Sequence, residues 1–221
     1  MIAITIDGPS GAGKSTVARA VAKKLDIIYL DTGAIYRALA YSAIGDGVDV
    51  TDEAAVGGFL SRVAVDVRYD GGEQRVFCGG RDTTPFIREH KISKAASDIS
   101  KHVSVRIKMS EIQREIAKNN DVVLDGRDAG TFVLPNAGYK FYLTADVGER
   151  ARRRFAELKQ KNADIQYERV LEDIKQRDYN DSNRPFAPLK KADDAVLIDS
   201  TSLTAEQVAE SVVKAVTAEK Q

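Results

Sequence analysis

Short apolar runs alternate with longer segments of helical spacing along most of the chain. The apolar runs that predict strands are residues 2–6, 27–30, 122–124, 140–143 and 195–198. Helical spacing, with apolar residues three or four positions apart, covers residues 15–25, 34–44, 104–118, 148–160 and 167–179. Strands and helices that take turns in this way predict an α/β fold, with a parallel sheet flanked by helices.

Residues 63–81 break this rhythm. There, polar and apolar positions alternate on both sides of Asp70-Gly71-Gly72, a pattern typical of a hairpin. A helix start with a capping pattern, Thr51-Asp52-Glu53, comes just before it. We therefore expect a small antiparallel insert at the edge of the α/β core, and a closing amphipathic helix over residues 205–221.

A glycine-rich segment joins the first predicted strand to the first predicted helix. Residues 8–16 read GPSGAGKST and fit G-x-x-x-x-G-K-[ST], the phosphate-binding P-loop. A loop of this kind aims backbone N–H groups at a phosphate, with the positive end of the helix dipole behind them. We expect it to bind a nucleoside triphosphate, with Lys14 reaching the β and γ oxygens and the Ser15 hydroxyl ligating Mg²⁺.

The composition of the chain limits which binding partners and which cellular compartment we expect for it. The chain of 221 residues has 33 basic and 33 acidic residues, and this zero net charge argues against a general nucleic-acid binder. Its one cysteine, Cys78, excludes an intrachain disulfide and a cysteine metal cluster. No apolar run approaches the roughly 18 residues of a membrane span, and no basic segment precedes the first strand. We expect a cytoplasmic monomer that binds neither membrane nor nucleic acid.

The segment after the second predicted strand is the first of three candidates for an acceptor site. It reads Asp31-Thr32-Gly33-Ala34-Ile35-Tyr36-Arg37, and carboxyl ends of parallel strands line the ligand crevice. Thr32 is a candidate N-cap of the following helix. Arg37 falls one helical turn after Gly33, where its guanidinium fork suits a phosphate.

The second candidate, Asp125-Gly126-Arg127-Asp128, ends the apolar run 122–124. An acidic strand end of this kind organises Mg²⁺ and water in P-loop enzymes. Carboxylates buried there are costly unless a ligand or metal neutralises them. The structural alternative is a tight turn held by Asp–Arg pairing.

Arginines late in the chain form the third candidate. Arg150, Arg153 and Arg154 fall on one side of the predicted helix 148–160, which suits a lid over polyphosphate, whereas Arg152 belongs to a solvated face. Phosphoryl transfer needs positive charge over the transferring group and little covalent help. The candidate catalytic residues are Lys14, Asp125, Arg127 and Arg153.

Five motifs together carry a family resemblance. They are I-D-G-P-S-G-A-G-K-S-T, L-D-T-G-A-I-Y-R, D-G-R-D-A-G-T, the R-A-x-R-R helix and R-D-x-x-D-x-x-R. With them the chain resembles the bacterial cytidylate kinases over nearly its whole length. The resemblance implies one kinase unit with an adenylate-kinase-like core (1–30, 100–145 and 185–221). It further implies a nucleotide-monophosphate region with the antiparallel insert (31–99) and a helical lid (146–184).

The resemblance also implies phosphoryl transfer from ATP to CMP or dCMP with Mg²⁺. The residues expected at ATP are Gly8, Pro9, Ser10, Gly11, Ala12, Gly13, Lys14, Ser15, Thr16, Arg150 and Arg154. Those expected at CMP are Ser97, Arg106 and Asp128 on the cytosine; Arg37, Arg127 and Arg184 with Thr32 and Tyr36 on the phosphate; and Arg177 and Asp181 on the ribose. The family's P-loop often has glycine where Ser15 stands, which leaves open whether Ser15 or Thr16 ligates Mg²⁺.

Two other classes of function remain to be weighed. A related small-molecule kinase would phosphorylate UMP or a metabolite hydroxyl, and a hydroxyl acceptor needs a general base where this chain has arginines. A nucleotide switch of the GTPase kind would carry the guanine-reading motif N-K-x-D, which the sequence lacks. The choice among CMP, dCMP and UMP, and the donor preference, are left open.

Overall fold

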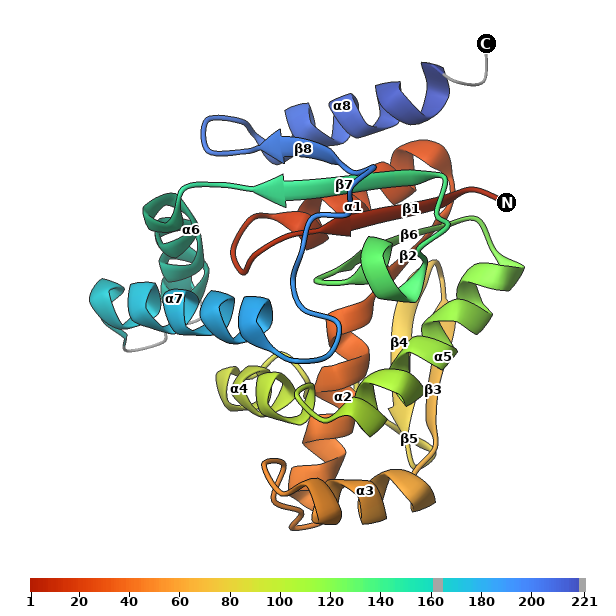
Figure 1. Cartoon of the computed structure of the whole chain (residues 1–221), viewed down its shortest axis with the longest axis vertical. Helices are drawn as coiled ribbons and strands as arrows, with labels where there is room; N and C mark the ends of the chain where they lie inside the picture. Colours follow the sequence, from red (N-terminus) through yellow and green to blue (C-terminus); the bar gives the residue numbers. More distant parts are fainter. Residues whose placement is uncertain (161–164, 219–221) are drawn as a thin grey trace. The chain divides into compact units, whose positions relative to one another are not determined.

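The computed structural model describes residues 1–160 and 165–218, which form two compact units (Figure 1). The first unit comprises Met1–Ile27 with Asp121–Gln221, and the second comprises Ile28–Asn120. The helix expected over 104–118 as part of the core belongs to the second unit, and the predicted lid region belongs to the first. The predicted lid 146–184 and closing helix 205–221 both extend into residues outside the described ranges.

Four parallel strands form the sheet of the first unit. They are β1 (Ala3–Asp7), β6 (Val122–Gly126), β7 (Tyr139–Thr144) and β8 (Val196–Asp199), in the order β6-β1-β7-β8. The register pairs Asp7 with Gly126 on one side and with Tyr142 on the other, so the carboxyl ends of β1 and β6 are level. The continuous apolar run 122–124 is fully buried, as expected of an inner parallel strand. The predicted parallel α/β sheet is confirmed.

The helices of the first unit pack in two pairs. Helices α1 (Lys14–Leu25) and α8 (Ala205–Ala218) contact each other along buried valines, including Val17, Val21, Val208 and Val212. Helices α6 (Val147–Gln160) and α7 (Tyr167–Asn183) share an apolar cluster built around Ala151, Leu158, Val170 and Ile174. These elements agree with the predicted helices to within a few residues.

A short π-helix, η1 (Ala129–Val133), follows β6 and was not predicted. The carboxylate of Asp7, at the end of β1, accepts the backbone N–H groups of Ala129 and Gly130 at 2.8 and 2.7 Å. Asp7 thereby ties the start of η1 to the strand that leads into the glycine-rich loop. Burial raises the pKa of Asp7 to about 6, although the two backbone donors oppose the shift.

The titration of Asp7 gives a prediction for stability. Between about pH 4 and pH 6 the folded state holds the Asp7 proton more tightly than the unfolded chain, so this group's contribution to the free energy of unfolding falls as pH rises. The Asp7→Asn variant has no titratable group at this position. We expect the stability of the wild type relative to Asp7→Asn to decrease by about 2 kcal/mol between pH 4.5 and 7.5. Urea unfolding of both proteins across this range measures it, and a constant difference would contradict the raised pKa.

The second unit contains the predicted antiparallel insert. Strands β3 (Val65–Asp70) and β4 (Glu73–Cys78) pair with Asp70 opposite Glu73, and Gly71 and Gly72 form the turn with φ of 59° and 82°. A third strand, β5 (Arg81–Asp82), pairs with β4 and begins at the last residue of the predicted insert. The hairpin prediction from alternation is therefore confirmed, with one short strand added.

Strand β2 (Ile28–Asp31) and four helices complete the second unit: α2 (Thr32–Gly45), α3 (Glu53–Arg62), α4 (His90–Ile99) and α5 (Val103–Asn119). Helix α4 was not predicted. The expectation that Thr32 caps α2 is wrong, because Thr32 is already helical and Asp31 is the N-cap, its carboxylate accepting the Ala34 N–H at 2.8 Å. Among the described residues, no helix is both long enough and apolar enough to cross a membrane.

Candidate active site

The P-loop leaves β1 and turns into α1 within the first unit. Gly8, Gly11 and Gly13 have φ of 146°, 76° and 89°, which an L side chain rarely adopts. A Cβ on Gly8 would lie 1.9 Å from the Leu143 carbonyl oxygen, and one on Gly11 would lie 2.9 Å from the Arg150 carbonyl oxygen. Glycine is therefore required where this loop passes β7 and α6.

Lys14 is the first residue of α1 and is buried. Its Nζ donates to the Pro9 carbonyl at 2.7 Å, which folds the side chain back over the loop. Burial lowers the pKa of Lys14 well below its usual value, and the charge of Arg127 adds to this, while Asp125 opposes it. An anion at the loop would relieve both effects, so the position favours a phosphate ligand.

Ser15 and Asp125 bring the P-loop and the end of β6 together. The Ser15 hydroxyl donates to Asp125 Oδ2 at 2.7 Å, and Asp125 is buried. A hydroxyl and a carboxylate are the hard oxygen ligands that Mg²⁺ prefers, and one or two of them suffice when phosphates and waters supply the rest. Within the described residues no group of three or more His, Cys, Asp or Glu could hold a metal.

Asp178 on α7 supports the P-loop, a role that sequence reasoning missed. It accepts the backbone N–H of Ser10 at 3.0 Å and pairs with the guanidinium of Arg150. Arg150 is buried and also donates to the carbonyls of Ser10 and Ala145, both at 2.9 Å. The R-D-x-x-D-x-x-R motif contained Asp178, but its partners lie too far along the chain to be read from spacing.

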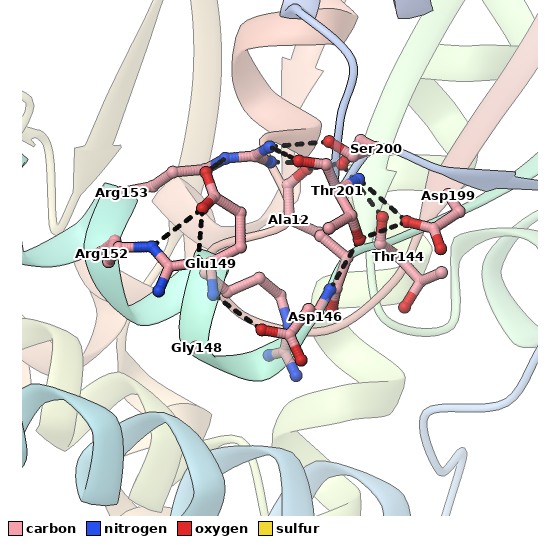
Figure 2. Close-up of polar contacts among 12 residues, drawn as sticks. Ala12, Thr144, Asp146, Gly148, Glu149, Arg152, Arg153, Asp199, Ser200 and Thr201 are labelled. Atoms are coloured by element: carbon pink, nitrogen blue, oxygen red, sulfur yellow. Dashed lines mark hydrogen bonds and ion pairs between the residues drawn. The ribbon is translucent and has the colours of Figure 1, made fainter.

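Arg153 lies in a second network that links α6 to the turn after β8 (Figure 2). Its guanidinium donates to the Ser200 carbonyl at 2.7 Å, to Ser200 Oγ at 3.2 Å and to Glu149 at 3.0 Å. Ser200 Oγ in turn lies 3.3 Å from the carbonyl of Ala12 in the P-loop. Arg153 thus contacts the P-loop backbone through one serine.

The three arginines that were expected to act together have different partners. Arg150 binds the P-loop carbonyl and Asp178, Arg153 binds the turn after β8, and Arg154 pairs with Glu157 at 2.9 Å. Arg152 is exposed and pairs with Glu149, in agreement with a solvated face. The role of Arg150, Arg153 and Arg154 toward polyphosphate stays a prediction.

In the first unit, Arg127 and Asp128, which follow β6, form ion pairs with residues at the end of α7. Arg127 Nε donates to Asp181 Oδ2 at 2.7 Å. The two terminal nitrogens of Arg184 lie near both carboxylates: Nη2 is 3.2 Å from Asp128 Oδ1, and Nη1 is 3.9 Å from Asp181 Oδ1. Burial alone would raise the pKa of Asp181, but Arg127, Arg177 and Arg184 outweigh it and lower the pKa. The carboxylate that Arg127 binds lies 54 residues away in the sequence. Arg127 therefore does more than hold the tight turn after β6.

In the second unit, Arg37 of α2 pairs with Asp31 at the end of β2. Arg37 Nη2 donates to Asp31 Oδ2 at 2.8 Å. The side-chain amide of Gln74 on β4 accepts the Asp31 N–H at 2.7 Å and donates to the Asp31 carbonyl at 3.2 Å. A Cβ on Gly33 would lie 3.0 Å from Arg37 Nη1, so glycine leaves room for the guanidinium. The insert therefore fixes the end of β2, where Asp31 holds the guanidinium of Arg37.

Tyr36 and Arg106 also meet within the second unit. The guanidinium carbon of Arg106 lies 5.6 Å from the Tyr36 ring centroid, and its Nη1 donates to the Ser100 carbonyl at 3.4 Å. Ser97 is half-buried on α4, and its carbonyl accepts the Ser100 hydroxyl at 2.9 Å. The structure thus brings together two of the expected CMP residues, Tyr36 and Arg106.

Comparison with known proteins identifies the family of this chain. Residues 4–218 match the family model described as cytidylate kinase. The chain is 48% identical to the cytidylate kinase of Bacillus licheniformis over 97% of its length and 96% of the relative's, and 46% identical to that of Bacillus subtilis with the same coverage.

Solved structures match more distantly. An uncharacterized protein from Eubacterium ventriosum has a TM-score of 0.52 at 12% identity, covering 98% of this chain and 99% of that chain. A gluconokinase from Sinorhizobium meliloti has a TM-score of 0.50 at 14% identity, covering 99% and 94%. These likenesses concern the fold alone. By the family model and by its full-length relatives, the chain belongs to the cytidylate kinase family.

Proposed function

We infer that this chain transfers the γ-phosphoryl group of ATP to CMP or dCMP, giving ADP and CDP or dCDP. Membership in the cytidylate kinase family over residues 4–218 carries this conclusion. The sequence supports it, because the motifs expected at the acceptor carry arginines, which suit a phosphate acceptor, whereas a hydroxyl acceptor needs a general base. The alternative of a kinase for another small molecule is not favoured.

The donor site is proposed to be the P-loop. Its backbone N–H groups would hold the β- and γ-phosphates, and Lys14 would stabilise the charge that builds up during transfer. Ser15 and Asp125 would hold Mg²⁺, directly or through water, with Thr16 as the alternative hydroxyl. Mg²⁺, when bound, would neutralise part of the charge of the phosphates.

The acceptor site is proposed to consist of the residues that the family resemblance implies. Arg37, Arg127 and Arg184, with Thr32 and Tyr36, would hold the CMP phosphate, and Arg177 and Asp181 the ribose. A guanidinium has five N–H donors, so Arg127 can keep its bond to Asp181 while it binds a phosphate oxygen. Ser97, Arg106 and Asp128 would read the cytosine.

Substituting Asp128 tests the reading of the base. Cytosine has an exocyclic amino group that donates to a carboxylate, whereas uracil has a carbonyl there. We expect Asp128→Asn to lower kcat/KM for CMP at least tenfold. The ratio of kcat/KM for UMP to kcat/KM for CMP should rise, because the asparagine amide can donate a hydrogen bond to the uracil carbonyl. KM for ATP is expected to change less than twofold. Equal losses for CMP and UMP would instead assign Asp128 to the pairing with Arg184 at 3.2 Å.

A coupled ADP-release assay tests the proposed reaction. The acceptors are CMP, dCMP, UMP and AMP, with cytidine as the matched control that has the base and sugar but no phosphate. We expect turnover with CMP and dCMP, and none with cytidine. Phosphorylation of cytidine would show a hydroxyl acceptor and overturn the proposal, and a preference for UMP or AMP would reassign the base.

We also propose a monomer that works in the cytoplasm on small-molecule nucleotides, without nucleic acid. The balanced charge supports the absence of a nucleic-acid partner, and the lone Cys78 agrees with a reducing compartment. Light scattering of the purified chain measures the oligomeric state.

A further inference from the structure

One face of α5 is polar although it is buried. Arg106, Ser110 and Gln113 are 2%, 0% and 1% exposed. They are four and then three residues apart, a spacing that places them on the same side of a helix, with neighbouring side chains in reach of each other. A buried face of this kind usually consists of apolar residues, as Val105 and Met109 are elsewhere on α5.

Two of these side chains find no protein partner. Among the described residues, the Ser110 hydroxyl and both polar atoms of the Gln113 amide are buried without a hydrogen bond. A helical serine commonly donates to the carbonyl four residues earlier, and Ser110 does not make that bond. Buried polar groups in native proteins are nearly always hydrogen-bonded, to protein or to ordered water. These three atoms therefore point to a small polar group held against α5.

Water matches the chemistry of this position. The Gln113 amide has two donors and one acceptor, and the Ser110 hydroxyl can donate and accept. An internal water typically makes about three hydrogen bonds to buried polar groups that otherwise lack partners. An anion would need a cluster of donors, and a cation would need several oxygens, whereas Ser110 and Gln113 present a mixture.

The third member of the polar face is Arg106. Its guanidinium is held from one side by the Ser100 carbonyl at 3.4 Å and by the ring of Tyr36 at 5.6 Å. Ser110 lies one turn further along α5, on the other side of Arg106 along the helix axis. A water bound by Ser110 would therefore lie within reach of the arginine side chain.

We propose that Ser110 and Gln113 hold an internal water that positions the guanidinium of Arg106. Both are thus positioning residues for recognition of the pyrimidine. The consequence for the base rests on the proposed function, in which Arg106 contacts the cytosine. The water itself does not depend on that function.

Steady-state kinetics of three variants test the effect on the base. Ser110→Ala removes the hydroxyl, Gln113→Met keeps the length of the side chain without its amide, and the third variant combines them. We expect each single change to raise KM for CMP about three- to tenfold, with kcat and KM for ATP changed less than twofold. Because both residues bind the same water, the double variant should be no worse than the poorer single variant. Met109→Leu, at a buried apolar position of α5, is the control and should leave KM for CMP unchanged.

Crystal structures of the ligand-free wild type and Ser110→Ala provide a readout that does not require the reaction. We expect a water bonded to Ser110 and Gln113 in the wild type, and its loss together with a changed Arg106 rotamer in the variant. If Ser110→Ala does not fold, Ser110→Cys replaces it, because the thiol fills the site and binds water weakly. A wild-type crystal structure without water at Ser110 and Gln113 overturns the proposal. So do variants whose melting temperature is above that of the wild type and whose KM for CMP is unchanged. If the wild type did not phosphorylate CMP, the proposed function would be refuted, but the bound water would not.

Discussion

Lys14→Met is expected to lower kcat at least a hundredfold without destabilising the protein. The ammonium group would stabilise negative charge on the transferring phosphoryl, and a hundredfold loss corresponds to about 2.7 kcal/mol of transition-state stabilisation. Stability should hold because Lys14 is buried and burial already lowers its pKa, so its charged form is costly without a ligand. Methionine fills the same space without that cost. Single-turnover kinetics and urea unfolding measure the two effects separately.

The control is Lys23→Met, the same substitution at an exposed position of α1. It should change kcat by less than twofold. If Lys14→Met kept more than a tenth of the wild-type kcat, Lys14 would contribute under roughly 1.4 kcal/mol to catalysis, and its assignment would be wrong.

Arg127→Met is expected to cost both stability and activity. It leaves the carboxylate of Asp181 buried without its 2.7 Å donor, and removing one partner of a buried ion pair costs about 3–5 kcal/mol. It also removes one of the arginines proposed to hold the CMP phosphate, so kcat/KM for CMP should fall at least a hundredfold.

A second substitution separates the two losses. Arg127→Met combined with Asp181→Asn no longer has the uncompensated charge, and we expect it to recover most of the lost free energy of unfolding. Activity should stay low, since the arginine is still missing. Recovery of kcat/KM together with stability would show that Arg127 only supports the fold.

The elements that the sequence predicted correctly are ones in which local periodicity or turn chemistry determines the structure, although α4, which also has apolar residues at helical spacing, was missed. The run 122–124 is buried in the sheet, Gly71 and Gly72 form the hairpin turn, and the P-loop joins β1 to α1. The N-cap of α2 was misassigned to Thr32, because serine, threonine and aspartate all cap helices and composition cannot choose between neighbours.

The residues that sequence reasoning missed act over long distances along the chain. Asp7 holds η1 across more than 120 residues, Asp178 holds Ser10 across 168, and Ser200 reaches Ala12 across 188. No periodicity records such contacts, because they exist only once the sheet is assembled. Likewise, spacing placed Arg150, Arg153 and Arg154 on one side of α6, but the partner of each is decided by the segment packed against it.

The ties at Ser200 affect how this enzyme could be recombined with its relatives. Arg153 of α6 bonds to main-chain carbonyls of the turn after β8, and Thr201 of that turn accepts the Asp146 N–H just before α6 at 2.9 Å (Figure 2). A chimaera that imported residues 146–184 alone would have to match these contacts with a foreign turn. The helix and the turn therefore constitute a single cassette, and exchanging them together preserves the hydrogen bonds that fix the Ala12 peptide of the P-loop.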